Sequence, residues 1–270
     1  WNLVDWPLAM QPMMAASYYS RAEEEAIKQY FDEKAEELCL EKTDVPQAWP
    51  AWSQLAYRTE TSLKAVVAQE LGLNTDNLPA TLRIMVCGAQ SGQRAMELAQ
   101  YLDDVEVIAV DESLANIAKG TRMAQSLNMD NIVFWPWSIA QRFVADGHQV
   151  HWMEVGRVPS PAMTELSLAA LINTASSTGA IVHMRTALAE QTQGDKQIRR
   201  LVAEHNLQPT RTALRQLRRM VLANRQDTLW TELLKDEDFY SLGGCRDRWF
   251  RPQDANQLKE LLALVSNEVE

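Results

Sequence analysis

A glycine-containing turn after a short apolar run is the feature of this sequence best suited to chemistry. The run from Leu82 to Cys87 is followed by Gly88-Ala89-Gln90-Ser91-Gly92, after which a helical pattern begins. Glycine at such a turn lets a ligand approach the backbone, because a Cβ atom would block the approach or would not tolerate the backbone angles. Asp111 ends the next apolar run, 23 residues after Gly88. An acidic residue at about this distance can accept hydrogen bonds from two ribose hydroxyls, so the pair predicts a nucleotide-type site.

Each half of this motif also has a simpler explanation. A Gly-x-x-x-Gly turn can be no more than a tight connection from a strand to a helix. Asp111 can be the N-cap of the helix that follows it. The two features together, at this spacing and between strand and helix patterns, favour the ligand site.

The elements that would position these residues alternate between strand and helix over about 100 residues. Such alternation with short links predicts an α/β fold with a parallel, Rossmann-like sheet, whose ligands bind at the carboxyl ends of the strands. The predicted strands are 82–87, 105–110, 132–134, 150–155 and 180–184, and the predicted helices are 92–102, 113–127 and 162–176.

Different patterns flank this domain, so we predict three regions: 1–79, 80–187 and 188–270. The first begins with an apolar arm, and helices are expected at 21–40, with Ser20 as a possible N-cap, and at 60–71. The third is helical, with helices expected at 195–206, 210–224, 229–235 and 253–266 and a loop at 236–244.

Composition excludes several classes of protein. Hydrophobic residues make up 46% and charged residues 23% of the chain, as in globular proteins. The net charge of −10 makes nucleic-acid binding unlikely, and no apolar run of about 18 residues predicts a membrane span. Cysteine and histidine show no metal-ligand spacing, so we assign no metal and expect a reduced, cytoplasmic protein. A start at Trp1 instead of Met is compatible with a processed or trimmed chain.

The glycine turn and Asp111 resemble the first two motifs of class I AdoMet-dependent methyltransferases. The chain is similar in particular, over about Leu82 to Phe250, to bacterial methyltransferases often fused behind tetratricopeptide repeats, although no repeat occurs in residues 1–80. The most specific segment is Asp238-Phe239-Tyr240-Ser241-Leu242-Gly243-Gly244-Cys245-Arg246-Asp247. The resemblance implies S-adenosyl-L-methionine (AdoMet) as cofactor and a methyl acceptor, a small molecule or a protein, that the sequence does not identify.

The same resemblance supplies site residues. Those expected to bind the cofactor are Gly88, Gln90, Gly92, Gln93, Asp111, Ser113, Leu114, Trp137 and Ser138. Tyr240, Arg246 and Asp247 are the catalytic candidates, because the C-terminal signature would fold back over the mouth of the site. Glu154, near a strand end, is a weaker candidate. The alternative is that Arg246 and Asp247 form a structural ion pair and Tyr240 packs in the core.

Three departures from the family pattern keep a second function open. Gln90 occupies the position of the middle glycine of the first motif. Ser138 replaces the acidic residue that usually follows the third strand and holds adenine, and Gln149 lies near the position of an Asp that is usual near the fourth strand. A catalytically degenerate accessory protein would instead bind a partner, through residues 1–16 or the face formed by residues 199–225, which contain seven Arg and one acidic residue, Glu204. Its arginines are also compatible with a solvated helical face or with contact to the acidic helix. Another adenosine-containing ligand in the same crevice is a further alternative.

Overall fold

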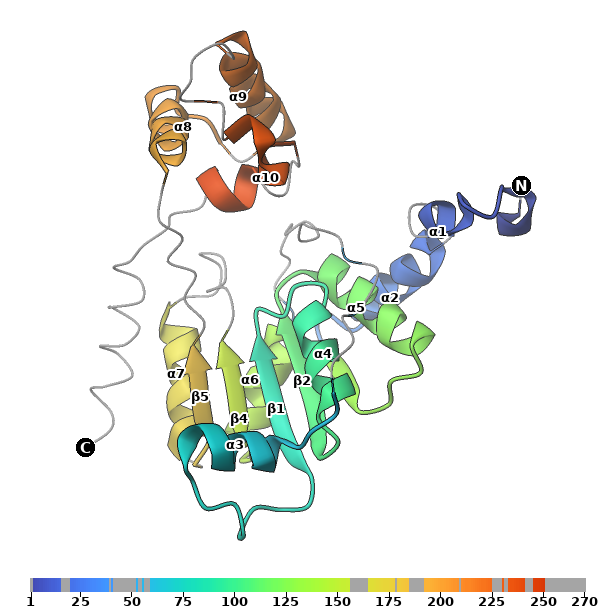
Figure 1. The fold of residues 1–270 in the computed structure, drawn as a ribbon, viewed down its shortest axis with the longest axis vertical. Helices are drawn as coiled ribbons and strands as arrows, with labels where there is room; N and C mark the ends of the chain where they lie inside the picture. The colour runs from blue at the N-terminus through green and yellow to red at the C-terminus, as the bar shows by residue number, and fades with distance from the viewer. Residues whose placement is uncertain are drawn as a thin grey trace. The chain divides into compact units, whose positions relative to one another are not determined.

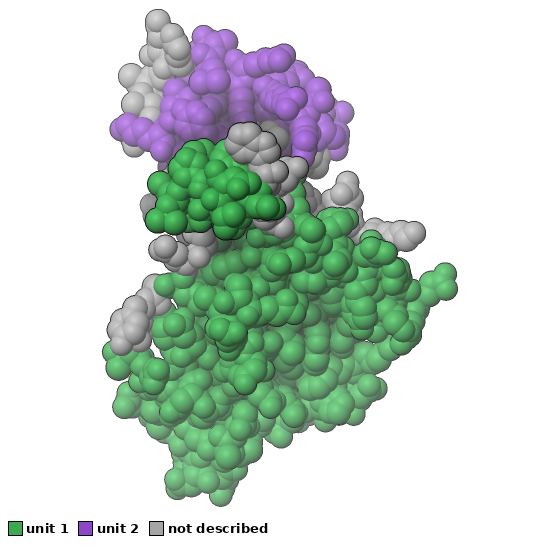
Figure 2. All heavy atoms as spheres, turned by 90° about the vertical axis from the view of Figure 1, so that its right-hand side faces the viewer, with its two compact units in different colours: residues 1–47, 52–185, 270 green, residues 48–51, 186–269 purple. Residues whose placement is uncertain are grey.

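The chain divides into two compact units in a computed structural model. Unit 1 comprises residues 1–47, 52–185 and 270, and unit 2 comprises residues 48–51 and 186–269 (Figure 2). The structure describes residues 2–15, 20–38, 40, 52, 55, 59–155, 165–177, 179–184, 192–208, 210–224, 230, 233–240 and 245–250.

Unit 1 is built on a parallel sheet of five strands in the order β3-β2-β1-β4-β5 (Figure 1). The strands are β1 (Leu82–Cys87), β2 (Val105–Asp111), β3 (Ile132–Pro136), β4 (Trp152–Val155) and β5 (Ile181–Met184). Leu82 pairs with Val105 on one side of β1, and Ile84 pairs with Trp152 on the other. The predicted α/β, Rossmann-like class is therefore confirmed, and the strand order reverses between β1 and β4, where such sheets bind ligands.

Helices cover both faces of this sheet. α4 (Gln93–Tyr101) and α5 (Leu114–Ser126) lie on one face, and α6 (Trp137–Ala145) and α7 (Glu165–Ser177) lie on the other (Figure 1). Burial on both faces explains why β1 and β2 are nearly continuous apolar runs.

The N-terminal helices of unit 1 pack against the same core. α2 (Arg21–Glu33) lies along α5, where Arg122 Nε contacts Glu24 Oε1 at 2.9 Å, and α3 (Leu63–Leu71) buries Leu63 and Val67. The remaining short elements are η1 (Leu3–Asp5) and α1 (Gln11–Met14). The described residues before β1 thus belong to the unit that contains the sheet.

Unit 2 has an apolar core of its own, which includes Ile198, Leu217, Phe239 and Trp249. Its elements are α8 (Gln193–Glu204), α9 (Arg211–Ala223), η4 (Leu233–Lys235), α10 (Glu237–Tyr240) and the π-helical turn η5 (Arg246–Phe250). Threonine side chains cap both long helices: Thr192 Oγ1 accepts from Asp195 N, and Thr210 Oγ1 accepts from Ala213 N.

The structure differs from the sequence prediction in several elements. α6 and η5 were not predicted, α2 ends at Glu33 instead of residue 40, and α10 lies inside the segment expected to be a loop. Within the helix predicted at 229–235, the structure describes the short 3₁₀ helix η4. The helix expected at 253–266 lies outside the described residues. Within the described ranges, no helix is both long enough and apolar enough to cross a membrane.

Candidate functional site

The turn between β1 and α4 uses left-handed backbone at every second residue. The φ angles are +70° at Gly88, +54° at Gln90 and +88° at Gly92. Ala89 N donates to Val110 O at 2.9 Å, which ties the turn to β2. Glycine adopts such angles at no steric cost, whereas Gln90 adopts one that side-chain-bearing residues disfavour.

Gly92 has a second reason to lack a side chain. A Cβ atom there would lie 2.4 Å from the Phe134 ring, and one at Gly120 would lie 2.3 Å from the same ring. Phe134 of β3 therefore fits against the start of α4 and against α5 only because both positions are glycine.

Asp111 connects this turn to the start of α5. Its Oδ2 accepts from Gln90 N at 2.8 Å, and its Oδ1 accepts from Ser113 N and Asn116 Nδ2, both at 2.9 Å. The residue is only 6% exposed. Ser113 is the N-cap of α5 and accepts from Asn116 N. One carboxylate thus holds the carboxyl ends of β1 and β2 in a fixed relation.

The carboxyl end of β3 adds Trp137 and Ser138, the first two residues of α6. Ser138 Oγ donates to Leu38 O at 3.1 Å, so this hydroxyl already has an acceptor in the segment that follows α2. Nε1 of Trp137 is shielded from solvent and has no hydrogen-bond partner among the described residues. Trp135 packs on Phe143 with ring centroids 5.1 Å apart.

An ion pair between β4 and α4 lies at the reversal of strand order. Arg94 Nε and Nη2 contact Glu154 Oε1 and Oε2 at 2.9 and 3.1 Å, and the Glu154 side chain is only 2% exposed. Burial alone would lower the pKa of Arg94, but the hydrogen bond and charge of Glu154 raise it. Sequence analysis found Glu154 only as a strand-end acid and missed Arg94, which lies 60 residues away.

Trp52 contacts the turn from a distant part of the chain, and sequence analysis missed it as well. Its indole Nε1 donates to Ser91 O at 3.1 Å, and the residue is buried. Nothing in the local sequence signals this contact, because 39 residues separate the two groups.

A cavity of about 680 Å³ lies elsewhere in unit 1, between α2, α5, β3 and α6. Its walls are mainly apolar and include Ile27, Phe31, Met129, Trp135 and Ile139. None of the nine predicted cofactor residues lines it, although its wall includes Phe134, which packs against Gly92.

All nine predicted cofactor residues lie at the carboxyl ends of β1, β2 and β3 or in the first turns of α4, α5 and α6. The catalytic candidates Tyr240, Arg246 and Asp247 belong to unit 2. Tyr240 is 58% exposed, and its hydroxyl donates to Leu234 O at 2.7 Å. The role of these three residues over the site stays a prediction.

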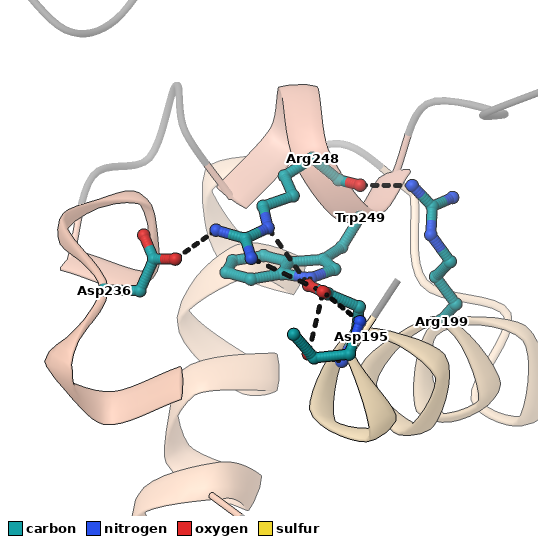
Figure 3. Close-up of polar contacts among 6 residues, drawn as sticks. Asp195, Arg199, Asp236, Arg248 and Trp249 are labelled. Atoms are coloured by element: carbon teal, nitrogen blue, oxygen red, sulfur yellow. Dashed lines mark hydrogen bonds and ion pairs between the residues drawn. The ribbon is translucent and has the colours of Figure 1, made fainter. Parts of the chain in front are cut away.

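Unit 2 contains a polar cluster around Asp195 (Figure 3). Arg248 Nε and Trp249 Nε1 donate to Asp195 Oδ1 at 3.0 and 2.8 Å, and Arg248 also pairs with Asp236. Burial would raise the pKa of Asp195, but hydrogen bonds from Trp249, Thr192 and Arg248 together hold it below its ordinary value. The cluster links α8 to η5 and to Asp236, which lies between η4 and α10. Trp249 of η5, Phe239 of α10 and Cys245 are buried in the core of unit 2.

Comparison with known proteins gives distant structural likenesses. No family model matches the sequence, and no curated protein is similar enough to match it. A structure of PKMT2 from Rickettsia typhi in complex with AdoHcy is similar over 75% of this chain, at 15% identity and a TM-score of 0.49. A structure of coclaurine N-methyltransferase bound to N-methylheliamine and SAH shares 11% identity over 98% of this chain and 91% of its own, with a TM-score of 0.32. The chain spans 41% of the length of the PKMT2 protein.

Proposed function

We propose that this protein is an AdoMet-dependent methyltransferase. The observation that carries the proposal is the glycine turn, which Asp111 holds against the start of α5 at the carboxyl ends of β1 and β2. That place in a parallel sheet is where nucleotide ligands approach the backbone. The resemblance of these residues to the first two motifs of class I methyltransferases supports AdoMet as the ligand.

The residues at the turn fit the parts of AdoMet in a definite order. Gly88 and Gly92 leave the backbone open to the ligand, and Asp111 accepts from the ribose hydroxyls while it holds the turn. Trp137 and Ser138 lie at the end of β3, where the adenine would lie. The side chain of Gln90 would point toward the methionine part.

AdoMet supplies the methyl group, carried on a sulfonium, and the protein supplies orientation and electrostatics. A general base is needed only for an acceptor that carries a proton at neutral pH. We propose that the methyl acceptor is bound and activated by the catalytic candidates Tyr240, Arg246 and Asp247. The acceptor itself is a small molecule or a protein that the described residues do not identify.

The direct test is calorimetric titration of the full chain with AdoMet and with AdoHcy. Micromolar binding of both is expected, and Asp111→Ala should abolish it. Because Asp111 also holds the turn, Asn116→Ala is the matched variant: it removes one donor to the carboxylate and leaves the carboxylate in place. Glu106→Ala, at an exposed position on the same strand, controls for a change in net charge.

The outcomes separate the two functions that the sequence leaves open. Binding that survives Asn116→Ala but not Asp111→Ala would show that the site requires the carboxylate itself, as a ligand contact or as the group that holds the turn. Failure of the folded wild-type chain to bind either compound would overturn the proposal and favour the accessory protein that binds a partner. Unchanged affinity for AdoMet in Asp111→Ala would mean that the cofactor site does not include Asp111.

A further inference from the structure

The outer face of α9 carries charge of a single sign. Arg211, Arg215, Arg218 and Arg219 lie on this helix, which has no acidic residue. Its opposite face buries Leu214, Leu217 and Val221 in the core of unit 2. The helical repeat places all four arginines on one side. We call Arg211, Arg215, Arg218, Arg219 and Leu222 the α9 arginine face.

These arginines differ from others in the same unit because they have no acidic partner. Among the described residues, none of the four takes part in an ion pair or a hydrogen bond. Arg200, by contrast, contacts Glu204 at 2.6 Å, and Arg248 contacts both Asp195 and Asp236. In a chain of net charge −10, four guanidinium groups on one helix face without carboxylates form a local positive patch.

Two further observations concern the same face. Nε and Nη2 of Arg218 are shielded from solvent and have no acceptor within the described ranges. A shielded donor without an acceptor is costly, so native proteins seldom leave one. Leu222, one helical turn after Arg218, is 43% exposed although its neighbour Val221 is fully buried. The exposed side chains of Arg211, Arg215 and Arg219 therefore present cationic donors beside the apolar side chain of Leu222.

We propose that the α9 arginine face binds an acidic segment of a partner protein that carries an apolar residue among its carboxylates. Arg211, Arg215 and Arg219 are four residues apart, which corresponds to about 6 Å along a helix. Carboxylates at every fourth residue of a helical peptide have the same spacing. The planar guanidinium group binds a carboxylate through two parallel hydrogen bonds. Leu222 would pack against the apolar residue.

Nucleic acid fits this face less well. Single-stranded nucleic acid is usually held by aromatic side chains on which bases stack, and α9 contains none. The net charge of −10 also opposes a densely charged polyanion. A peptide with fewer charges and an apolar residue suits the mixture of four arginines and one leucine.

The test is fluorescence anisotropy of a labelled helical peptide with Glu at every fourth position and one leucine between them. The full chain should bind it, and the triple variant Arg211→Gln, Arg215→Gln, Arg219→Gln should bind at least about tenfold more weakly. The matched control is Lys28→Gln, Lys34→Gln, Arg83→Gln, which removes the same charge from exposed or partly exposed ion pairs in unit 1. Leu222→Ser should weaken binding by about tenfold or less, and Leu127→Ser, at an equally exposed leucine, should not.

Several results would overturn this proposal. An equal loss of peptide affinity in the two triple variants would show that binding depends on the net charge of the chain and not on the α9 arginine face. Tighter binding of a single-stranded RNA of equal charge, lost in the α9 triple variant, would assign the face to nucleic acid. Preference for vesicles of anionic lipid would assign it to a membrane surface. The result does not depend on AdoMet binding, because no residue of the face belongs to the glycine turn.

Discussion

Two buried aspartates, one in each unit, are used in different ways. Asp111 is 6% exposed and Asp195 is 5% exposed. Three of the donors to Asp111 are uncharged, namely two backbone N–H groups and the amide of Asn116. Asp195 accepts from the guanidinium of Arg248, besides Trp249 and Thr192.

This difference separates a candidate ligand site from a structural cluster. A carboxylate paired with an arginine has its charge balanced locally, and breaking such a pair costs stability. A carboxylate that orders two backbone N–H groups at the carboxyl edge of a sheet positions a turn that a ligand can approach. We therefore expect substitutions around Asp111 to change ligand binding, and substitutions around Asp195 to change the stability of unit 2.

The largest expected effect is that of Gly92→Ala on unit 1. The new Cβ atom would lie 2.4 Å from the Phe134 ring, at a φ of +88°. We expect a loss of about 2–4 kcal/mol in the free energy of unfolding, together with loss of AdoMet binding. Urea unfolding measures the first and calorimetry the second. Gly147→Ala is the control, because its φ is +84° but nothing lies within 4 Å; it should cost only about 1 kcal/mol. Equal losses in the two variants would contradict the role given to Phe134.

Asp195→Asn should destabilise unit 2 by about 2 kcal/mol and leave AdoMet affinity unchanged. Since folding lowers the pKa of Asp195 below its ordinary value of 3.8, its contribution is present above about pH 4 and is lost as the pH falls through the lowered pKa. Guanidinium unfolding at pH 7 and at acidic pH should show a smaller acid loss in the variant than in the wild type. A variant that loses cofactor binding while unit 2 remains stable would break the distinction between the two aspartates.

Glu154→Gln tests whether the buried ion pair between β4 and α4 contributes mainly to stability, as expected for Asp195, or to ligand binding, as expected for Asp111. Arg94 is about one third exposed, so solvent offsets part of the lost charge interaction, and we expect a loss of about 1 kcal/mol. Glu106→Gln removes a comparable but exposed pair with Arg83 and should change stability by less than about 0.5 kcal/mol. Chemical unfolding of both variants provides the measurement. Equal free energies of unfolding in the two variants would mean that the burial of Glu154 does not strengthen its ion pair with Arg94.

The sheet could be predicted from sequence because each strand is a local apolar run. The turn residues and Asp111 could be found because their spacing reflects one strand–helix–strand unit. α6 was missed because Pro136 reads as an interruption, although proline is tolerated just before a helix begins. Ile139, Ala140, Phe143 and Val144 show a helical spacing that was available in the sequence.

Contacts between distant segments could not be predicted. Arg94 meets Glu154 because β1 and β4 are neighbours, and this pairing follows from the crossover and not from any local pattern. The contact of Trp52 with Ser91 has the same origin. The C-terminal signature could be recognised in the sequence, but its role could not. Its residues Phe239 and Cys245 are buried in the core of unit 2, so a distinctive motif can reflect packing as well as chemistry.

The smallest effect on stability, and the sharpest test of the glycine turn, is expected from Gln90→Gly. Relief of the left-handed backbone favours the folded state, but glycine also adds entropy to the unfolded chain, so the net change should be less than about 1 kcal/mol. Asn128→Gly, at a φ of +53° on the exposed turn after α5, is the control.

We expect tighter AdoMet binding in Gln90→Gly alone, because under the proposed function a side chain at this position would take up space that the middle glycine of the resembled motif leaves to the ligand. Weaker binding would instead assign a direct contact to the Gln90 amide. If calorimetry finds equal affinities in the wild type and both variants, Gln90 does not face the cofactor, and its departure from the family pattern is no argument for a degenerate site.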